Sequence, residues 1–236
     1  REAVVSEMET IAAGERENTY RFLASLYLKP PSDAVIAMIK DGSILSAITS
    51  EEGGADSPFY SELAEFVKNA AEMPNLIEEL EAEHTALFVL PSGVLPHEAA
   101  YLDREQKLGG RVTISVRQFY ERAGMEILDS CIEMPDHIGM ELEFMGFLCK
   151  LEKEFWEKAA ISSLQKCIEF QKTFLSEHLS KWVYQCCEKV IEKATCGFYK
   201  AIAHVTVEFM KSEEKYISEL YANICKEGEE ICETAA

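Results

Sequence analysis

Residues 198–224 read "FYKAIAHVTVEFMKSEEKYISELYANI", and the spacing of their large apolar side chains decides the fold class. These side chains recur at gaps of 3, 4 or 7 positions, which places them on one face of an α-helix. The repeat is formed by Phe198, Ile202, Val205, Phe209, Tyr216, Leu220 and Ile224. The stretch predicts one long helix whose apolar face packs against other helices.

The same helical spacing continues through most of the chain, and alternating β-branched runs are almost absent. Proline and glycine lie between the periodic segments and mark their ends. Helices are predicted near residues 15–28, 33–41, 58–72, 76–88, 114–124, 136–159, 162–176, 179–195 and 198–226. No internal repeat or linker separates two halves. The sequence therefore predicts an all-α, single-domain bundle of about nine to eleven helices over residues 1–236.

The longest predicted loop covers residues 90–112, and we expect it to carry function, since long ordered loops in compact helical proteins often do. Helix starts are predicted at Ser32, Ser57 and Asn75, whose side chains suit N-caps, and at Pro135 as a first helical residue.

Composition and charge exclude several classes of protein. The chain has 42 acidic and 23 basic side chains, a net charge of -19, so nucleic acid and anionic membranes are poor partners and a basic partner is favoured. No apolar run is long enough to span a bilayer, and the first twenty residues lack a basic region followed by an apolar one. We expect a soluble, cytoplasmic protein without stable membrane insertion.

Motifs for metal, cofactor or nucleophilic chemistry are missing from the sequence. The 8 cysteines contain no Cys-x-x-Cys pair, which favours reduced thiols that act as small apolar residues. One Glu-x-x-His motif, Glu81–His84, is present where a di-iron helical site needs two, and Tyr101 stands where a zinc-protease motif needs histidine. We therefore expect no catalytic residues, no metal and no cofactor.

The stretch 133–145, "EMPDHIGMELEFM", places ionisable side chains among residues typical of a core. Asp136 lies at the predicted helix start, where free backbone N–H groups favour a carboxylate, and His137 shares a helix face with Glu141. Two interpretations are open. Asp136 caps the helix while His137 pairs with Glu141, or the group recognises a partner.

Four stretches, in this order, resemble the TorD/DmsD family of cytoplasmic redox-enzyme maturation chaperones. They are "YRFLASLYLKPPS" at 20–32, "HTALFVLPSGVLPHEAAYL" at 84–102, "PDHIGMELEFM" at 135–145 and "FLSEHLSKWVYQCCEKV" at 174–190. The chain departs from the family pattern at two places. His84 replaces an aromatic residue, and Pro135 comes one position later than usual.

The resemblance implies a TorD-like, non-enzymatic chaperone. It would bind the twin-arginine signal peptide of the precursor of a molybdopterin-containing oxidoreductase catalytic subunit, and hold it for cofactor insertion and assembly before export. Such a peptide carries a basic pair and an apolar stretch, which suit carboxylates beside an apolar groove. The expected contacts are the pair Asp136 and His137, the apolar residues Leu87 and Phe88, the loop residues Glu98 and Tyr101, and their neighbours Pro135 and Glu141. Trp182 and Glu177–His178 are expected to pack in the core.

Two other functions compete with this one: a nucleotide-binding or nucleotide-hydrolysing, or cofactor-handling, maturation enzyme, and a structural subunit of a reductase complex. The expected oligomeric state is a monomer with a fraction of domain-swapped dimer, because helical folds with long connections can exchange helices. The candidate hinges are residues 90–112 and 125–135.

Overall fold

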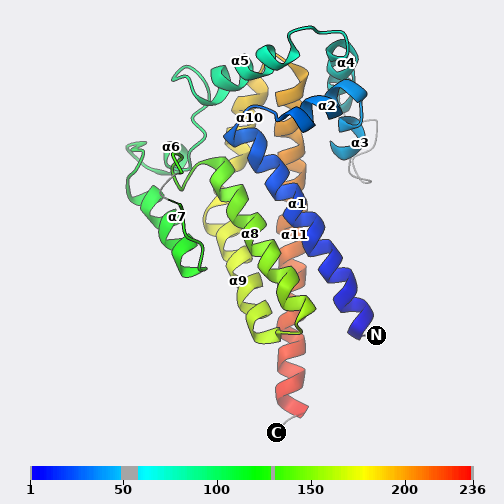
Figure 1. Cartoon of the computed structure of the whole chain (residues 1–236). Helices are drawn as coiled ribbons and strands as arrows, with labels where there is room; N and C mark the ends of the chain where they lie inside the picture. The colour runs from blue at the N-terminus through cyan, green and yellow to red at the C-terminus, as the bar shows by residue number, and fades with distance from the viewer. Residues whose placement is uncertain (1, 49–57, 129–130, 235–236) are drawn as a thin grey trace. The chain divides into compact units, whose positions relative to one another are not determined.

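The computed structural model describes residues 2–48, 58–128 and 131–234, with side chains over 7–48, 60–128 and 131–225. These residues form eleven α-helices, one 3-10 helix and no strand, which confirms the all-α class (Figure 1). The helices are α1 (Glu2–Leu28), α2 (Asp33–Asp41), α3 (Ile44–Ile48), α4 (Pro58–Ala70), α5 (Leu76–Phe88), α6 (Ala99–Leu102), α7 (Arg111–Arg122), α8 (Ile138–Glu157), α9 (Ile161–Glu177), η1 (Leu179–Lys181), α10 (Val183–Lys193) and α11 (Gly197–Thr234).

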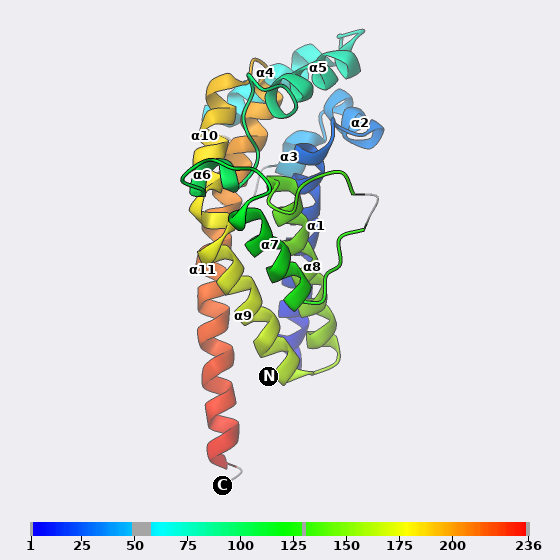
Figure 2. The ribbon, with the colours of Figure 1, turned by 90° about the vertical axis from the view of Figure 1, so that its left-hand side faces the viewer.

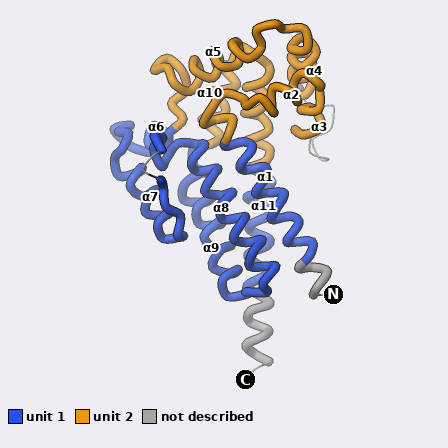
Figure 3. Tube along the Cα trace, in the orientation of Figure 1, with its two compact units in different colours: residues 1–24, 97–182, 210–236 blue, residues 25–96, 183–209 orange. Residues whose placement is uncertain are grey.

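The chain divides into two compact units, each built from separate stretches of sequence (Figure 3). Unit 1 contains residues 1–24, 97–182 and 210–236, and unit 2 contains residues 25–96 and 183–209. The boundaries fall inside α1, inside the predicted loop, after η1 and inside α11. A single domain over the whole chain stays a prediction.

Unit 1 is a helical bundle in which α8 and α9 lie side by side (Figures 1 and 2). Helix α8 is buried along most of its circumference, as its continuous apolar sequence predicts. A Cβ atom at Gly146 would lie 3.2 Å from Cγ of Arg21, so α8 and α1 approach closely there. Ile168 of α9 packs in one apolar cluster with Leu220 and Ile224 of α11.

A buried arginine connects four helices of unit 1. The Arg16 guanidinium donates to Glu152 at 2.7 Å and to Glu213 at 2.8 Å, and also to the side-chain oxygen of Gln171. Arg16, Glu152 and Glu213 are all nearly inaccessible to solvent. A charge at such depth is tolerated only when paired, so these contacts fix how α1, α8, α9 and α11 pack.

Unit 2 contains helices α2 to α5 and α10. The predicted Ser32 cap is confirmed, since Oγ of Ser32 accepts from the Val35 N–H. Asn75 precedes α5 but makes no side-chain capping bond, and Ser57 lies outside the described residues. His84, which replaces the family's aromatic residue, packs against Phe88 and places Nε2 3.2 Å from the Tyr27 carbonyl.

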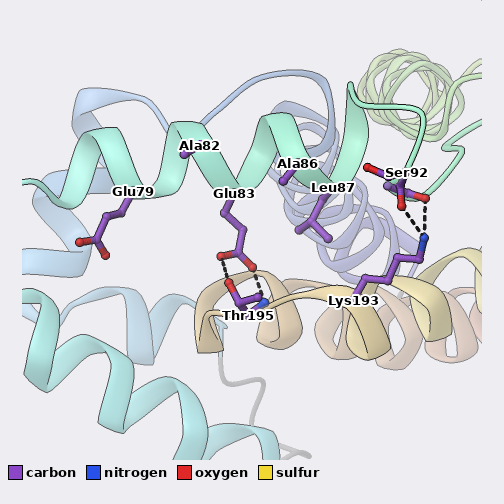
Figure 4. Close-up of a pocket in the computed structure, with 9 residues that line it drawn as sticks. Glu79, Ala82, Glu83, Ala86, Leu87, Ser92, Lys193 and Thr195 are labelled. Atoms are coloured by element: carbon purple, nitrogen blue, oxygen red, sulfur yellow. Dashed lines mark hydrogen bonds between the residues drawn. The ribbon is translucent and has the colours of Figure 1, made fainter.

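A groove of about 640 Å³ in unit 2 runs beside α5 (Figure 4). The Glu83 carboxylate accepts the backbone N–H groups of Thr195 and Cys196, which lead into α11. The Lys193 ammonium donates to the carbonyls of Ser92 and Gly93 at 2.7 and 2.8 Å. These contacts hold the chain after α5 against the end of α10.

The predicted boundaries were wrong at several places. Helix α1 begins at Glu2 and not near residue 15, and the predicted helix 179–195 is divided into η1 and α10. Helices α3 and α6 were not predicted, because their five and four residues are too short for a periodic pattern. The predicted loop 90–112 contains α6 and the first residues of α7. Helix α8 begins at Ile138 and not at Pro135, because His137 has an extended backbone with ψ 138°.

None of the helices that the structure describes is long and apolar enough to cross a membrane. The cysteines within the described side chains, Cys131, Cys149, Cys167, Cys186, Cys187, Cys196 and Cys225, are free thiols, as predicted.

Candidate functional site

The first turn of α8 is capped by a histidine. Nδ1 of His137 accepts the Gly139 N–H at 3.0 Å, so the neutral ring carries its proton on Nε2. The interpretation in which Asp136 caps the helix is wrong, because the cap is His137 and the Asp136 carboxylate accepts from Ala99. The pairing of His137 with Glu141 stays a prediction. Asp136 and Glu141 make other contacts, which build a cluster of buried acids in unit 1.

Asp136 binds the backbone of the segment that precedes α6. Its carboxylate oxygen Oδ2 accepts the Ala99 N–H at 3.1 Å, and its carbonyl accepts the Glu98 N–H at 2.8 Å. An isolated antiparallel bridge joins His97 to His137 beside these bonds, with their rings edge to face at 5.2 Å. The Asp136 side chain is fully buried, and its second oxygen, Oδ1, has no hydrogen-bond partner.

Glu98 is held by a histidine from the end of α9. Its two carboxylate oxygens lie 3.0 and 3.1 Å from Nδ1 of His178. The imidazole stacks on Phe174 and meets Phe119 edge to face, with ring centres 5.2 and 5.6 Å apart. Glu98 and His178 are only 2% and 6% exposed, so the pair is formed inside the protein.

Glu141 is held by a tryptophan. Oε2 of Glu141 accepts the indole N–H of Trp182 at 3.1 Å, and the Glu141 carboxyl group also hydrogen-bonds to that of Glu98. The Trp182 ring also packs on Tyr101, with centres 5.3 Å apart. Burial, and then the nearby Glu98 carboxylate, raise the pKa of Glu141 well above its ordinary value. Glu141 therefore keeps its proton at a pH where an exposed glutamate is ionised.

The cluster of Glu98, Asp136 and Glu141, here called the acid cluster, lacks a strongly basic partner. Among the ion pairs of the described residues, none brings a lysine or an arginine to these carboxylates. Burial lowers the pKa of His97 despite the nearby Asp136 carboxylate. The acid cluster thus offers hydrogen-bond acceptors that a guanidinium, with five donors, would satisfy.

Six of the eight predicted site residues lie in unit 1 around this cluster: Glu98, Tyr101, Pro135, Asp136, His137 and Glu141. The Pro135 carbonyl accepts the Tyr120 hydroxyl at 2.7 Å. Leu87 and Phe88 belong to unit 2, where both are buried. Phe88 meets the Tyr27 ring edge to face, and Leu87 lines the groove beside α5 (Figure 4).

The sequence missed the polar roles of three residues. His178 and Trp182 do pack in the core as predicted, but they also bind Glu98 and Glu141. The same prediction was wrong for Glu177, which is exposed. His97 bridges to His137 and was not singled out. The Glu-His-Leu-x-x-Trp motif at 177–182 was the available signal, since it joins a histidine and an indole on one short stretch.

Exposed apolar side chains flank the acid cluster along the chain. Ile132, just before Pro135, is 94% exposed, and Leu102, at the end of α6, is 38% exposed. The others among the described side chains of unit 1 are Met8, Ile11, Leu108, Ile114, Leu128, Met134 and Ile161. Within the described residues, no group of three or more His, Cys, Asp or Glu side chains is placed to hold a metal ion.

A family model described as "Nitrate reductase delta subunit" matches residues 54–188, more than half of the chain. The chain belongs to this family, the TorD family. The four motifs had indicated the same family. A Chaperone protein TorD from Vibrio cholerae serotype O1 (El Tor Inaba N16961) is 24% identical over 219 residues, which cover 88% of this chain and 94% of that protein.

Another TorD relative, the Chaperone protein TorD of Aliivibrio fischeri, is 26% identical over 199 residues, 75% of this chain and 90% of that protein. A solved structure from Archaeoglobus fulgidus, named as a redox enzyme maturation protein, is 21% identical and covers 86% of this chain and 93% of its own, with a TM-score of 0.44. The names of the TorD relatives describe chaperones and agree with the prediction of a non-enzymatic role.

Proposed function

We propose that this TorD-family chain is a maturation chaperone that binds the twin-arginine signal peptide of a molybdopterin-containing oxidoreductase precursor. It acts in the cytoplasm and holds the precursor until the cofactor is inserted and the enzyme is assembled for export. Its TorD relatives are named chaperones, which supports the general role. The acid cluster supports the choice of a peptide with an arginine pair.

One observation carries the proposal: three buried carboxylates in unit 1 have no lysine or arginine partner among the described residues. Contrast the Arg16 network of the same unit, where two buried glutamates are neutralised by an internal guanidinium. A guanidinium supplied by a partner would do the same for Asp136 and would favour the ionised form of Glu141, with charge-assisted hydrogen bonds worth about 1.5–3 kcal/mol each.

The rest of the peptide also has a complementary surface. A twin-arginine peptide continues from its basic pair into an apolar stretch. The exposed apolar side chains Ile132 and Met134 lie within three positions before Pro135, and Leu102 follows the backbone that Asp136 binds. The net charge of -19 favours a basic segment at long range.

The test is a titration of fluorescent twin-arginine peptide against the full chain and two variants. Asp136→Asn removes the charge from the acid cluster but can still accept from Ala99 through its amide oxygen. We expect it to bind about 10- to 150-fold more weakly, the equivalent of one charge-assisted hydrogen bond. Glu143→Gln is the matched control, because Glu143 is partly exposed on α8 and pairs with Arg21 instead.

A peptide with glutamine in place of both arginines should bind weakly to all three proteins. Equal affinity of Asp136→Asn and the unmodified chain for the arginine peptide, with both folded by circular dichroism, would show that the acid cluster only builds the entry to α8. Capture from the native cell, followed by sequencing of the N-terminus of the captured subunit, would then identify the precursor.

The proposed oligomeric state is a monomer with a fraction of domain-swapped dimer. The hinge candidates are residues 90–112, which include the boundary between the units, and 125–135, of which 129–130 lie outside the described residues. Light scattering across a concentration series would test this, and an obligate tetramer would contradict it.

A further inference from the structure

The segment His97–Leu102 is attached to the rest of unit 1 by polar contacts and by the Tyr101 ring, which packs on Trp182. The N–H groups of Glu98 and Ala99 donate to Asp136, and the Glu98 carboxylate is bound to His178. The helix within the segment, α6, has four residues, too few to be stable alone. Its buried apolar side chains are the small ones of Ala99 and Ala100. Apart from the contact of Tyr101 with Trp182, the segment therefore exposes little apolar side-chain area of its own when it moves away.

The same segment closes the acid cluster. The Ala99 N–H donates to Oδ2 of Asp136, and Glu98 hydrogen-bonds to the carboxyl group of Glu141. Among the described residues, Oδ1 of Asp136 is buried without a hydrogen-bond partner. Both the Asp136 and the Glu141 side chains have no accessible surface in this arrangement. A partner's cationic group cannot touch either carboxylate until a neighbouring element moves. Among those neighbours, α8 is a 20-residue core helix, whereas His97–Leu102 is short.

We propose that His97–Leu102 is a displaceable cover, and that it moves away from Asp136 to admit a guanidinium of the partner to Asp136 and Glu141. This inference rests on the proposed function. At Asp136 the guanidinium replaces the Ala99 N–H as donor, so the internal contact competes with the partner. Two contacts, here called the latches, hold the cover closed: His178 binds Glu98, and Trp182 packs on Tyr101.

The stability of the latches determines the fraction of molecules in which the cover is open. Apparent affinity is the intrinsic affinity multiplied by the open fraction, and minor states of this kind are commonly populated at about 0.1–10%. Removal of the His178 imidazole leaves the Glu98 carboxylate buried without its partner when the cover is closed, but hydrated when it is open. The open fraction must rise, and the rate of peptide binding must rise with it.

The first measurement is hydrogen exchange in the free, full-length chain, followed at the amides of Glu98 and Ala99. We expect them to exchange at least about 100-fold faster than the Leu148 amide in the middle of α8, through an opening that low urea does not accelerate. If both exchange only through global unfolding, at the rate of Leu148, the segment is no cover and the proposal is overturned.

The second measurement is the association rate of the twin-arginine peptide by stopped flow. His178→Ala should bind about 10-fold faster than the unmodified chain, and His178→Asn, which can still donate to Glu98, should bind at nearly the unmodified rate. His84→Ala is the matched control. It also removes a buried imidazole, but in unit 2, where Nε2 contacts the Tyr27 carbonyl.

Each result has a defined meaning. A faster rate in His178→Ala alone supports the cover, and equal rates in His178→Ala and His84→Ala overturn it. If His178→Ala does not fold, Tyr101→Ala opens the second latch and replaces it in the same comparison. If no protein binds the peptide, the proposed function fails, while the exchange of Glu98 and Ala99 still decides whether the segment opens.

Discussion

The indole nitrogen of Trp182 lies 3.1 Å from Oε2 of Glu141, and this bond joins the end of η1 to the first turn of α8. Both side chains are fully buried. Because a buried carboxyl group is costly without donors, the indole N–H makes a large contribution to keeping Glu141 at this depth.

Trp182→Phe should lower the free energy of unfolding by about 1–3 kcal/mol, because it leaves a buried carboxyl group without its donor. Urea denaturation measures the loss. Glu141→Leu in the same background removes the acceptor as well. The loss of unfolding free energy in the double variant should therefore be smaller than the sum of the losses in the two single variants. If the losses are additive, the Trp182–Glu141 bond makes no measurable contribution to stability.

Glu141 should make stability depend on pH. Its pKa in the folded protein is raised above the unfolded value, mainly by burial. The folded state therefore binds the proton more tightly, and the stabilisation present below the unfolded pKa is lost as the pH rises through the folded pKa. Glu141→Gln is neutral at every pH. The stability of Glu141→Gln relative to the unmodified chain should therefore increase as the pH rises from about 4 to about 8. Urea denaturation midpoints at each pH would measure this difference. A difference that stays constant over this range contradicts the raised pKa.

Arg16→Met should destabilise the chain by about 3–5 kcal/mol, because it strands the buried carboxylates of Glu152 and Glu213. Arg21→Met is a comparison on the same helix. Arg21 is partly exposed and pairs with Glu17 and Glu143, so its loss should cost less than about 1 kcal/mol. Thermal or urea unfolding would measure both, and similar losses would contradict the role assigned to the Arg16 network.

Gly93→Ala should reduce stability by about 1–3 kcal/mol, since its Cβ would lie 2.3 Å from the Leu87 carbonyl oxygen and 2.4 Å from that of Ala86. Gly14→Ala is the opposite case. Its Cβ meets only the flexible Lys153 side chain at 3.7 Å, and alanine favours the helix by about 0.5–1 kcal/mol. The two variants should therefore shift the melting temperature in opposite directions; a shift in the same direction would refute the contact at Gly93.

Salt should weaken binding of the twin-arginine peptide to the unmodified chain more than to Asp136→Asn. Screening acts on the Asp136 charge, which the variant has already lost. Titrations at two salt concentrations would measure the two slopes, with the glutamine peptide as the uncharged control. Identical slopes would show that the peptide does not interact with the charge of Asp136.

The spacing of apolar residues predicted most of the length of the long helices, but it did not predict the short helices α3 and α6. Helix α11 was predicted because its large apolar residues lie 3, 4 or 7 positions apart, and only a helix places residues with this spacing on one face. Helix α6 is held by Asp136, which lies 37 positions beyond Ala99 in the sequence, so no window around residues 99–102 contains the reason for its existence. The start of α8 was predicted wrongly for the same reason, because Asp136 and His137 contact residues 97–99, which are distant in the sequence.

The acids of the candidate site could be chosen from motifs, but their partners could not. Glu98, Asp136 and Glu141 stand in two stretches that resemble the family. His178 lies 80 positions from Glu98, and Trp182 lies 41 from Glu141. Such pairings are decided by how α8 and α9 pack, which depends on many side chains at once. Helical spacing showed correctly that Trp182 is buried, but not which polar atom meets its N–H.

The interleaving of the two units in the sequence has a consequence for synthesis (Figure 3). Unit 1 needs residues 210–236, and unit 2 needs 183–209, so neither is complete while the ribosome is still translating the first three quarters of the chain. Contacts such as Arg16 with Glu213 close a loop of 197 positions, and contacts so distant form late. During its own translation this chain therefore has two incomplete cores, and both are completed only when α11 has been made.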